Sequence, residues 1–350
     1  SDYGATWSAP AVIRTSAATE SRQVHLDYAA NGIAHVTWQE NKGLVYANEG
    51  SKDAGSWAGS YKVIVPPITS GSPGVSSPFI MTSSNNRVDI IWAEGNSTNP
   101  VPDPNIYHIR SKDGGSTFSV AKKAVLISGW ASQFPSMVVE DQTGIIHLVW
   151  QEPYNFFAPD KGSIVYSRGT ESGGSMSWTT PIKITSIDDA REPDITLVGS
   201  TLHVVYTDYR SGGDEQYVRH TQCSANCISS SNWQATTNAI SGQIAGANGV
   251  DPLNLVSDVV QWGSCAVTYF HGTSIGLIDN EIIWGVDSCS GWSESPRDQI
   301  TTDSVRSINP NLDVHNNWWF YLVYEQGTET VRQIYLQRTK PNLLLPVVFK

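Results

Sequence analysis

Charged residues, and basic ones above all, are scarce in this chain of 350 residues. Asp, Glu, Lys and Arg together make up 16% of the sequence, against about 25% in an average soluble protein. Only 22 Lys and Arg stand against 33 Asp and Glu, which leaves a formal net charge of -11. Because so acidic a chain repels phosphate backbones and anionic lipid surfaces, we expect no nucleic-acid partner.

The sequence also has no apolar run long enough to cross a membrane. The longest run is the tail 343–349, which Pro346 interrupts and which is far shorter than the roughly 20 residues of a spanning helix. The first residues, Ser1 to Gly4, do not combine a basic stretch with an apolar one. Either no signal peptide exists or it lies outside this sequence, and we expect no membrane span.

Cysteine is rare as well, with four residues. Cys223 and Cys227 lie in Ser- and Asn-rich surroundings where a local disulfide closes a short loop, and Cys265 with Cys289 is the second potential pair; three connectivities stay open. A zinc site is the weaker reading, because neither pair has the spacing of a zinc knuckle and no His lies in register. Disulfides favour a secreted protein or one on the extracellular surface.

Aromatic residues are abundant by contrast, with 13 Trp and 14 Tyr, and no helical period persists for three turns. One phrase recurs, in which an alternating apolar strand ends in an aromatic residue and is followed by a polar or acidic one. Its six copies are residues 33–40, 88–94, 146–152, 202–208, 266–271 and 320–325. Since the aromatic positions lie 54 to 63 residues apart, the repeat is architectural.

Each copy belongs to a larger unit of four short strands, the arrangement of a propeller blade. The third unit shows this well, with strands expected at 134–139, 145–150, 163–167 and 178–184. We therefore predict an all-β fold, a six-bladed β-propeller with four-stranded antiparallel blades, as one domain over 1–340 with a tail at 341–350. The predicted blades are 22–64, 74–126, 131–184, 190–240, 247–300, and 304–339 together with 1–13.

Ring closure is predicted from the two ends of the chain. The sixth unit has only three strands, and residues 7–13 match the fourth-strand phrase at 178–184. We expect the N-terminal strand to complete the last blade and so to remove exposed sheet edges. The alternative is two unrelated β-sandwiches of about three repeats each.

A turn motif, residues 111–118, lies between the last two strands of the second unit. It has the order Ser-x-Asp-x-Gly-x-Thr-aromatic. The same order recurs at residues 2–7, and an altered form of it occurs at residues 51–57. With these motifs nearly the whole chain resembles the Asp-box (BNR) propellers of the sialidase superfamily. The resemblance implies a structural role for Asp2, Trp7, Asp53, Asp113 and Phe118. A turn carboxylate accepts backbone hydrogen bonds; a metal-binding or catalytic role for Asp113 is the alternative.

The polar or acidic residue one or two positions after the repeated aromatic defines the candidate binding site. In a propeller, loops that leave the second strand contribute to the ligand face, so these side chains are expected to surround a central funnel: Glu40, Glu94, Glu152, Asp208, His271 and Glu325. Such carboxylates bind cations, act as general acids or bases, or accept hydrogen bonds from sugar hydroxyls. The alternative is that they cap strand ends and face solvent. The aromatics, Trp38 among them, are expected to pack between blades.

Three arginines precede inner strands: Arg22, Arg191 and Arg306. The resemblance implies that three Arg hold the substrate carboxylate, while a Glu activates a nucleophilic Tyr and an Asp is the acid/base. The sequence departs from that pattern, because the entrance of the fifth blade, residues 248–252, has no Arg and residues 309–311 are Asn-Pro-Asn where the Tyr is expected. The catalytic residues stay unassigned.

The predicted function is extracellular recognition or structural support, with a glycan or an extracellular protein as partner. An exo-acting, sialidase-like glycoside hydrolase is the alternative, and an inverting hydrolase or a lyase stays open. Loops 96–105, 153–160 and 208–215 are further binding candidates, with Tyr154, Phe156 and Phe157 as stacking residues. No cofactor or metal is expected; calcium at Asp208, Asp214 and Glu215 has only weak support, since their spacing matches no calcium loop.

Overall fold

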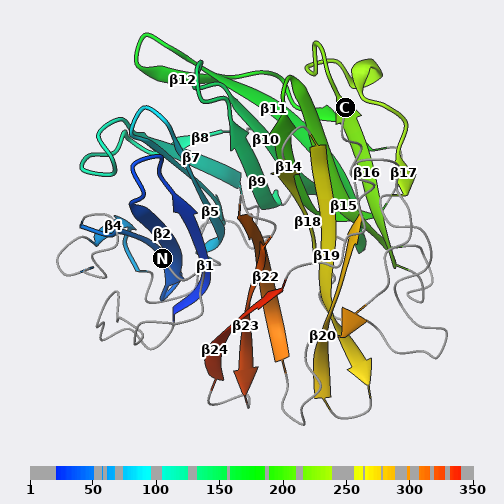
Figure 1. Ribbon diagram of the computed structural model, residues 1–350. Coiled ribbons are helices and arrows are strands. Elements are labelled where there is room, and N and C mark those ends of the chain that lie inside the picture. The colour runs from blue at the N-terminus through cyan, green and yellow to red at the C-terminus, as the bar shows by residue number, and fades with distance from the viewer. Residues whose placement is uncertain are drawn as a thin grey trace, which may run out of the picture. The chain divides into compact units, whose positions relative to one another are not determined.

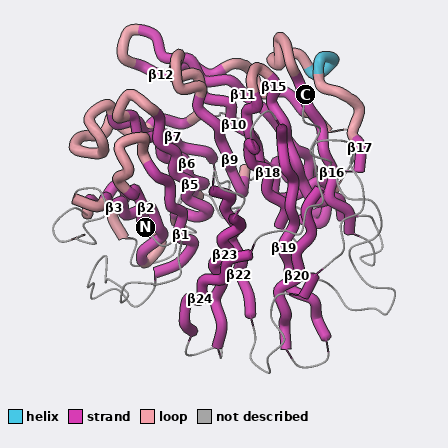
Figure 2. Tube along the Cα trace, viewed as in Figure 1, coloured by secondary structure: helices cyan, strands magenta, loops and turns pink. Residues whose placement is uncertain are grey.

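The computed structural model is built almost entirely of antiparallel β-strands (Figure 1). A three-residue 3-10 helix, η1 (Ser230–Asn232), is the one helix in the described part of the chain (Figure 2). The structure describes residues 21–50, 57, 61–67, 74–95, 105–124, 132–155, 158–185, 189–209 and 216–238, and then the backbone of the strands between 256 and 339. The chain divides into two compact units, Ser1–Pro159 with Val165–Pro181, and Asp160–Ile164 with Ile182–Lys350.

Three sheets lie wholly or mainly in the first unit, each made of strands that follow one another in the chain. The first sheet is β1 (Ser21–Tyr28), β2 (Ala34–Glu40), β3 (Gly43–Asn48) and β4 (Lys62–Val65). The second is β5 (Val75–Ser83), β6 (Arg87–Glu94), β7 (Asn105–Ser111) and β8 (Lys122–Lys123). The third is β9 (Gln133–Val139), β10 (Ile146–Asn155), β11 (Ala158–Ser172) and β12 (Ser175–Trp178), and β13 (Ile182–Lys183) also pairs with β11.

The second unit repeats this order. Its first sheet is β14 (Ala190–Val198), β15 (Thr201–Tyr209), β16 (Gln216–Cys223) and β17 (Thr237–Asn238). The next is β18 (Val256–Trp262), β19 (Cys265–Gly276), β20 (Asp279–Asp287) and β21 (Asp298–Gln299). The last has three described strands, β22 (Ser307–His315), β23 (Trp319–Gly327) and β24 (Arg332–Thr339).

Within the first unit the sheets pack face to face through their middle strands. Strand β6 is buried along almost its whole length, so its residues contact the core on both faces. On one face Trp92 packs with Leu44 and Tyr46 of the first sheet, and on the other Ile91 packs with Trp150 of the third. Burial on both faces explains why the strand is a nearly continuous apolar run, and it holds the strand ends in fixed positions.

The predicted all-β fold with four-stranded antiparallel sheets is confirmed for the described residues. The repeated aromatic lies near the end of the second strand of its sheet, as Trp38 does in β2 and Trp92 in β6, and both side chains are buried, as expected. Asp2, Trp7, Asp53 and the tail 341–350 lie outside the described residues. Completion of the last sheet by residues 7–13 stays a prediction. No described helix has the length and apolar character to span a bilayer.

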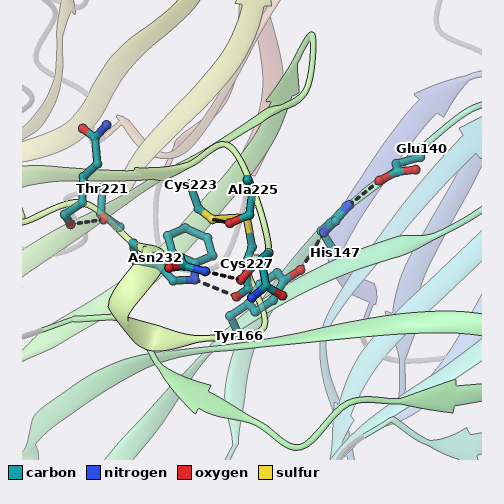
Figure 3. The surroundings of a disulfide bond; sticks show 11 residues. Glu140, His147, Tyr166, Thr221, Cys223, Ala225, Cys227 and Asn232 are labelled. Carbon is teal, nitrogen blue, oxygen red and sulfur yellow. Dashed lines mark hydrogen bonds and ion pairs between the residues drawn. A yellow bond between two sulfur atoms is a disulfide. The ribbon is translucent and has the colours of Figure 1, made fainter.

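One disulfide closes the loop after β16. Cys223, the last residue of the strand, is bonded to Cys227, and Trp233 donates its indole N–H to the carbonyl oxygen of Cys227 at 2.9 Å (Figure 3). Closing this loop restricts the unfolded chain and so stabilises the fold. Of the other two cysteines, Cys265 is the first residue of β19 and Cys289 lies outside the described residues.

Candidate functional site

The first strand of five sheets is interrupted at the same place. In each of them the register of pairing with the second strand shifts over a few residues. The shifts lie at 22–25 in β1, 76–79 in β5, 133–136 in β9, 191–194 in β14 and 308–311 in β22. In four of these strands the extra residue has a positive φ: Gln23 (52°), Ser77 (47°), Phe134 (48°) and Glu192 (48°). Such an interruption is a β-bulge, which redirects the neighbouring side chains.

The acidic residue of the repeated phrase lies beside this bulge. Glu40 pairs with Ser21, Glu94 with Val75, Asp208 with Ala190 and Glu325 with Ile308. We call this end of each sheet, which carries the bulge in its first strand and the acid in its second, the bulged end. The structure thus brings Arg22 and Glu40 to one end of the first sheet, and Arg191 and Asp208 to the equivalent end of the fourth.

Three of the acids accept a hydrogen bond from the aromatic residue two positions earlier. The indole N–H donates to the carboxylate at 3.5 Å in Trp38–Glu40, 2.8 Å in Trp92–Glu94 and 2.7 Å in Trp150–Glu152. The Ser132 hydroxyl also donates to Glu152, at 2.8 Å. Residues two apart on a strand share a face, so the Trp side chain directs the carboxylate.

Three of the acids are deeply buried. Glu40, Glu152 and Asp208 are 2%, 8% and 1% exposed, which contradicts for these three the alternative that the acids face solvent. Asp208 accepts hydrogen bonds from Nε and Nη2 of Arg219 at 2.9 and 2.7 Å. A carboxylate held by charged or indole donors in a buried position has a fixed orientation, so the bulged ends present oriented acceptors.

The other predicted site residues are placed less completely. Arg191 forms a two-point ion pair with Asp189, at 2.9 and 3.3 Å. The side chain of Arg22 and all of Arg306 lie outside the described residues, and only the backbone of Glu325 is described. His271 pairs with Val256 within β19, which continues to Gly276, so it does not end its strand as the acids do.

The loop candidates and the calcium expectation are not tested. Residues 96–104 and 210–215, with Asp214 and Glu215, lie outside the described residues, as do Phe156 and Phe157; Tyr154 is described only as backbone at the end of β10. Within the described part of the chain, no group of three His, Cys, Asp or Glu side chains is arranged to hold a metal ion.

The turn at 111–118 closes on its own carboxylate. Asp113 accepts hydrogen bonds from the backbone N–H and the hydroxyl of Thr117, at 2.8 and 2.6 Å, and from Ser111 at 2.7 Å. These hydrogen bonds, those from Thr117 foremost, lower the pKa of Asp113 to about 2. The turn also contacts the first sheet, because Tyr46 donates to the Gly114 carbonyl at 3.4 Å and lies edge-on to Phe118.

The opposite end of the sheets carries buried ionisable pairs that the sequence analysis missed. We call it the paired end. Each pair joins the second strand to the third: His35–Tyr46 and His147–Tyr166 at 2.7 Å, Asp89–His108 at 2.7 Å and His203–His220 at 3.1 Å. A signal existed, since His or Asp stands three residues before each of the first four repeated aromatics.

Burial keeps the two His–Tyr pairs and the His203–His220 pair uncharged. It lowers the pKa of His35 to about 4 and raises the pKa of Tyr46 and of Tyr166. In the third sheet the Tyr166 hydroxyl donates to Nδ1 of His147, because a neutral His147 donates its Nε2 proton to the Glu140 carboxylate. This contact joins Nε2 of His147 to Oε1 of Glu140 at 2.9 Å (Figure 3). A phenol with a raised pKa is a poor nucleophile.

The second sheet extends its pair into an ionic network. Arg110, 5% exposed, donates to both oxygens of Asp89, at 2.8 and 3.1 Å, and reaches Glu171 and the Gly144 carbonyl at 3.2 and 2.9 Å. Burial alone raises the pKa of Asp89, but His108 and Arg110 lower it overall. The network connects the second sheet to the third.

Comparison with known proteins places the fold. No family model and no curated sequence matches the chain. Among solved structures, the Hadza microbial sialidase Hz136 is 14% identical over 93% of this chain and 66% of its own, with a TM-score of 0.59. The K499G mutant of NanB sialidase from Streptococcus pneumoniae is 9% identical, over 93% and 69%, with a TM-score of 0.60. The intramolecular trans-sialidase from Ruminococcus gnavus is 10% identical, over 93% and 95%, with a TM-score of 0.58.

The chain therefore has the fold of the sialidases, and it spans about two thirds of the length of the first two of these enzymes. The predicted resemblance to the sialidase superfamily is confirmed at the level of the fold. A likeness at 9% to 14% identity shows the backbone arrangement alone, so activity has to be argued from the residues at the bulged ends.

Proposed function

We propose that this protein is a six-bladed β-propeller that acts outside the cell as a recognition module and binds a glycan at the bulged ends of its blades. The observation that carries the proposal is the repetition of the bulge in five sheets, beside oriented acceptors that suit sugar hydroxyls. The sialidase fold favours a carbohydrate ligand, and the Cys223–Cys227 disulfide favours an oxidising compartment.

Ring closure is part of this proposal, and the exposed face of β1 supports it. Leu26 is 45% exposed, while the residues at its position in the next two sheets, Ile80 and Met137, are each 1% exposed. Val24 on the same face is 64% exposed. An apolar strand face is normally covered, and the sixth sheet, completed by residues 7–13, is the cover that a closed ring supplies.

Closure has a direct test in the substitution Leu26→Ala. If the ring buries Leu26, the substitution lowers the free energy of unfolding by about 2–4 kcal/mol; at an exposed position the change stays within about 0.5 kcal/mol. The free energy is measured by urea denaturation, with Met137→Ala as the buried reference. A change within the exposed range contradicts closure over β1.

Binding is favoured over hydrolysis by the described tyrosines. Burial raises the pKa of four described tyrosines: Tyr46, Tyr107, Tyr166 and Tyr206. A nucleophilic tyrosine needs a lowered pKa instead. The second candidate is an exo-acting glycoside hydrolase. Glu152 favours it, because this acid is oriented by Trp150 and Ser132 and only 8% exposed, an environment suited to a general acid.

A glycan array and a fluorogenic sialoside assay separate these functions. The proposal expects binding to at least one glycan class, without turnover, in the wild-type protein. Turnover that is abolished by Arg22→Ala overturns the binding module in favour of the hydrolase. An empty array with specific self-association in sedimentation velocity overturns both functions and indicates an assembly subunit.

A further inference from the structure

The three bulges of the first unit lie side by side. They belong to β1, β5 and β9, and β5 packs against both of the others. The bulges of β1 and β5 are directly connected, since the Ser77 backbone N–H donates to the side-chain carbonyl of Gln23 at 2.9 Å. Side chains at these positions therefore form one continuous surface, which we call the bulge row: Gln23, Ser77 and Phe134.

Phe134 stands out within the bulge row. The equivalent positions hold the polar residues Gln23, Ser77 and Glu192, whereas Phe134 combines an aromatic side chain, a φ of 48° and an exposure of 37%. A bulky residue at positive φ is strained, and more than a third of this apolar residue is left in contact with solvent. Core packing explains neither feature, so the ring has to be useful where it lies.

The residues that precede Phe134 in the chain are polar. Gln133 beside it is half-buried and offers an amide, while Ser132 donates to Glu152 at 2.8 Å. At this end Glu94 and Glu152 are the acids of the second and third sheets, and the exposed Lys42 of the first sheet lies against Gly74 at the start of the second. The Glu152 carboxylate, held by Ser132 two residues before Phe134, disfavours a sugar carboxylate beside the ring, because like charges repel, but it suits hydroxyl donors.

We propose that Phe134 is a stacking platform for a neutral pyranose ring, whose C–H face lies on the phenyl ring while its hydroxyls bond to Gln133 and neighbouring acceptors. This inference rests on the proposed glycan-binding function and adds to it a subsite and a ligand class. An aromatic ring provides the apolar contact, and amide and carboxylate oxygens provide the orientation.

The test substitutes Phe134→Gly and measures binding to neutral and sialylated oligosaccharides on an array, then by titration calorimetry with the best neutral binder. Glycine accepts positive φ without strain, so the variant keeps the bulge while it loses the ring. We expect an affinity for the neutral glycan at least about tenfold weaker with an undiminished melting temperature. Phe134→Trp keeps a stacking surface and is expected to bind within about threefold of wild type.

Ser77→Gly is the matched control, because it makes the same backbone change at the next bulge without removing an aromatic ring. Unchanged affinity in Phe134→Gly, or wild-type binding confined to sialylated glycans, overturns the stacking platform while the proposed function stands. If wild type binds no glycan of either kind, the proposed function fails and this inference fails with it.

Discussion

The two ends of the same sheets are built on opposite principles. At the paired ends, side chains such as His35 and Tyr46 are buried, uncharged and hydrogen-bonded to each other across neighbouring strands. At the bulged ends the backbone itself is irregular, with Ser77 and Phe134 at positive φ. The paired ends therefore contribute to stability, whereas the bulged ends contain strained backbone. Backbone strain of that kind clusters at functional sites. Each prediction below acts on one of the two ends.

The largest effect is expected from Arg110→Ala at the paired end of the second sheet. The substitution leaves Asp89, which is 0% exposed, without its guanidinium partner, and an uncompensated buried charge costs about 3–5 kcal/mol. The loss is measured by urea denaturation. Lys112→Ala is the control, because the Lys112 side chain is 61% exposed and its ion pair with Glu171 contributes at most about 1 kcal/mol. Equal effects of the two substitutions contradict the buried network.

A smaller loss is expected from Gly115→Ala, in the turn that contacts the paired end of the first sheet. A Cβ at this residue lies 1.7 Å from the Tyr46 hydroxyl at a φ of +83°, so the turn or the Tyr46 ring has to move, at a cost of about 2–3 kcal/mol. Gly114→Ala is the matched control, since its φ is +68° with nothing within 4 Å, and it costs about 1 kcal/mol. Melting temperatures of the two variants check the order.

The paired ends also predict a pH dependence of stability. The pKa of His35 is about 4 in the fold against 6.5 for an unperturbed His, and burial lowers the pKa of His220 to about 3. The unfolded chain binds these protons more readily, so the stabilisation is complete above pH 6.5 and is lost as the pH falls toward 4. The free energy of unfolding falls by up to about 1.4 kcal/mol per pH unit for each such His.

Urea titrations at about pH 7.5, 6 and 5 measure this slope. His35→Asn removes one titrating group, so its slope is expected to be shallower than that of wild type. A slope that the substitution leaves unchanged shows that His35 does not contribute to it.

The smallest effect, with the opposite sign, is expected at the bulged ends. Ser77→Gly removes the strain of a positive φ of 47° but gives the unfolded chain more freedom, so stability changes by between 0 and about +1 kcal/mol. Thermal unfolding measures the change. A clear destabilisation indicates that the Ser77 side chain contributes to the fold itself and removes the contrast between the two ends.

Much of the fold follows from local patterns. Short apolar runs around Trp38, Trp92 and Trp150, alternating with polar residues at the first, predict the second strands, and the recurrence of the phrase predicts one sheet for each copy. The position of the acids at strand ends follows from the same phrase. The bulges do not, because Gln23, Ser77, Phe134 and Glu192 share no side-chain chemistry, and positive φ at a non-glycine residue depends on neighbouring strands rather than on propensity.

The buried acids show the same limit. Glu40 and Glu152 are visible in the sequence, but their burial depends on the sheets that cover them. The pairs His35–Tyr46 and His147–Tyr166 join residues of different strands, and strand register decides that they meet. The sequence indicates only the second-strand member of each pair, because a His or Asp stands three residues before each of the first four repeated aromatics. Nothing in the sequence indicates its partner on the third strand.

By itself, the sequence determined that this protein consists of repeated antiparallel sheets and that an acid lies at or near the end of the second strand in most of them. Those features depend on alternation along the chain, which is a local property of a strand. Only the tertiary structure decided that the acids are buried beneath indole donors, that His and Tyr pair at the other end, and that Phe134 lies exposed on a strained bulge. Those features depend on which residues stand opposite on neighbouring strands and sheets, and side-chain pairing across strands is a property of the assembled fold.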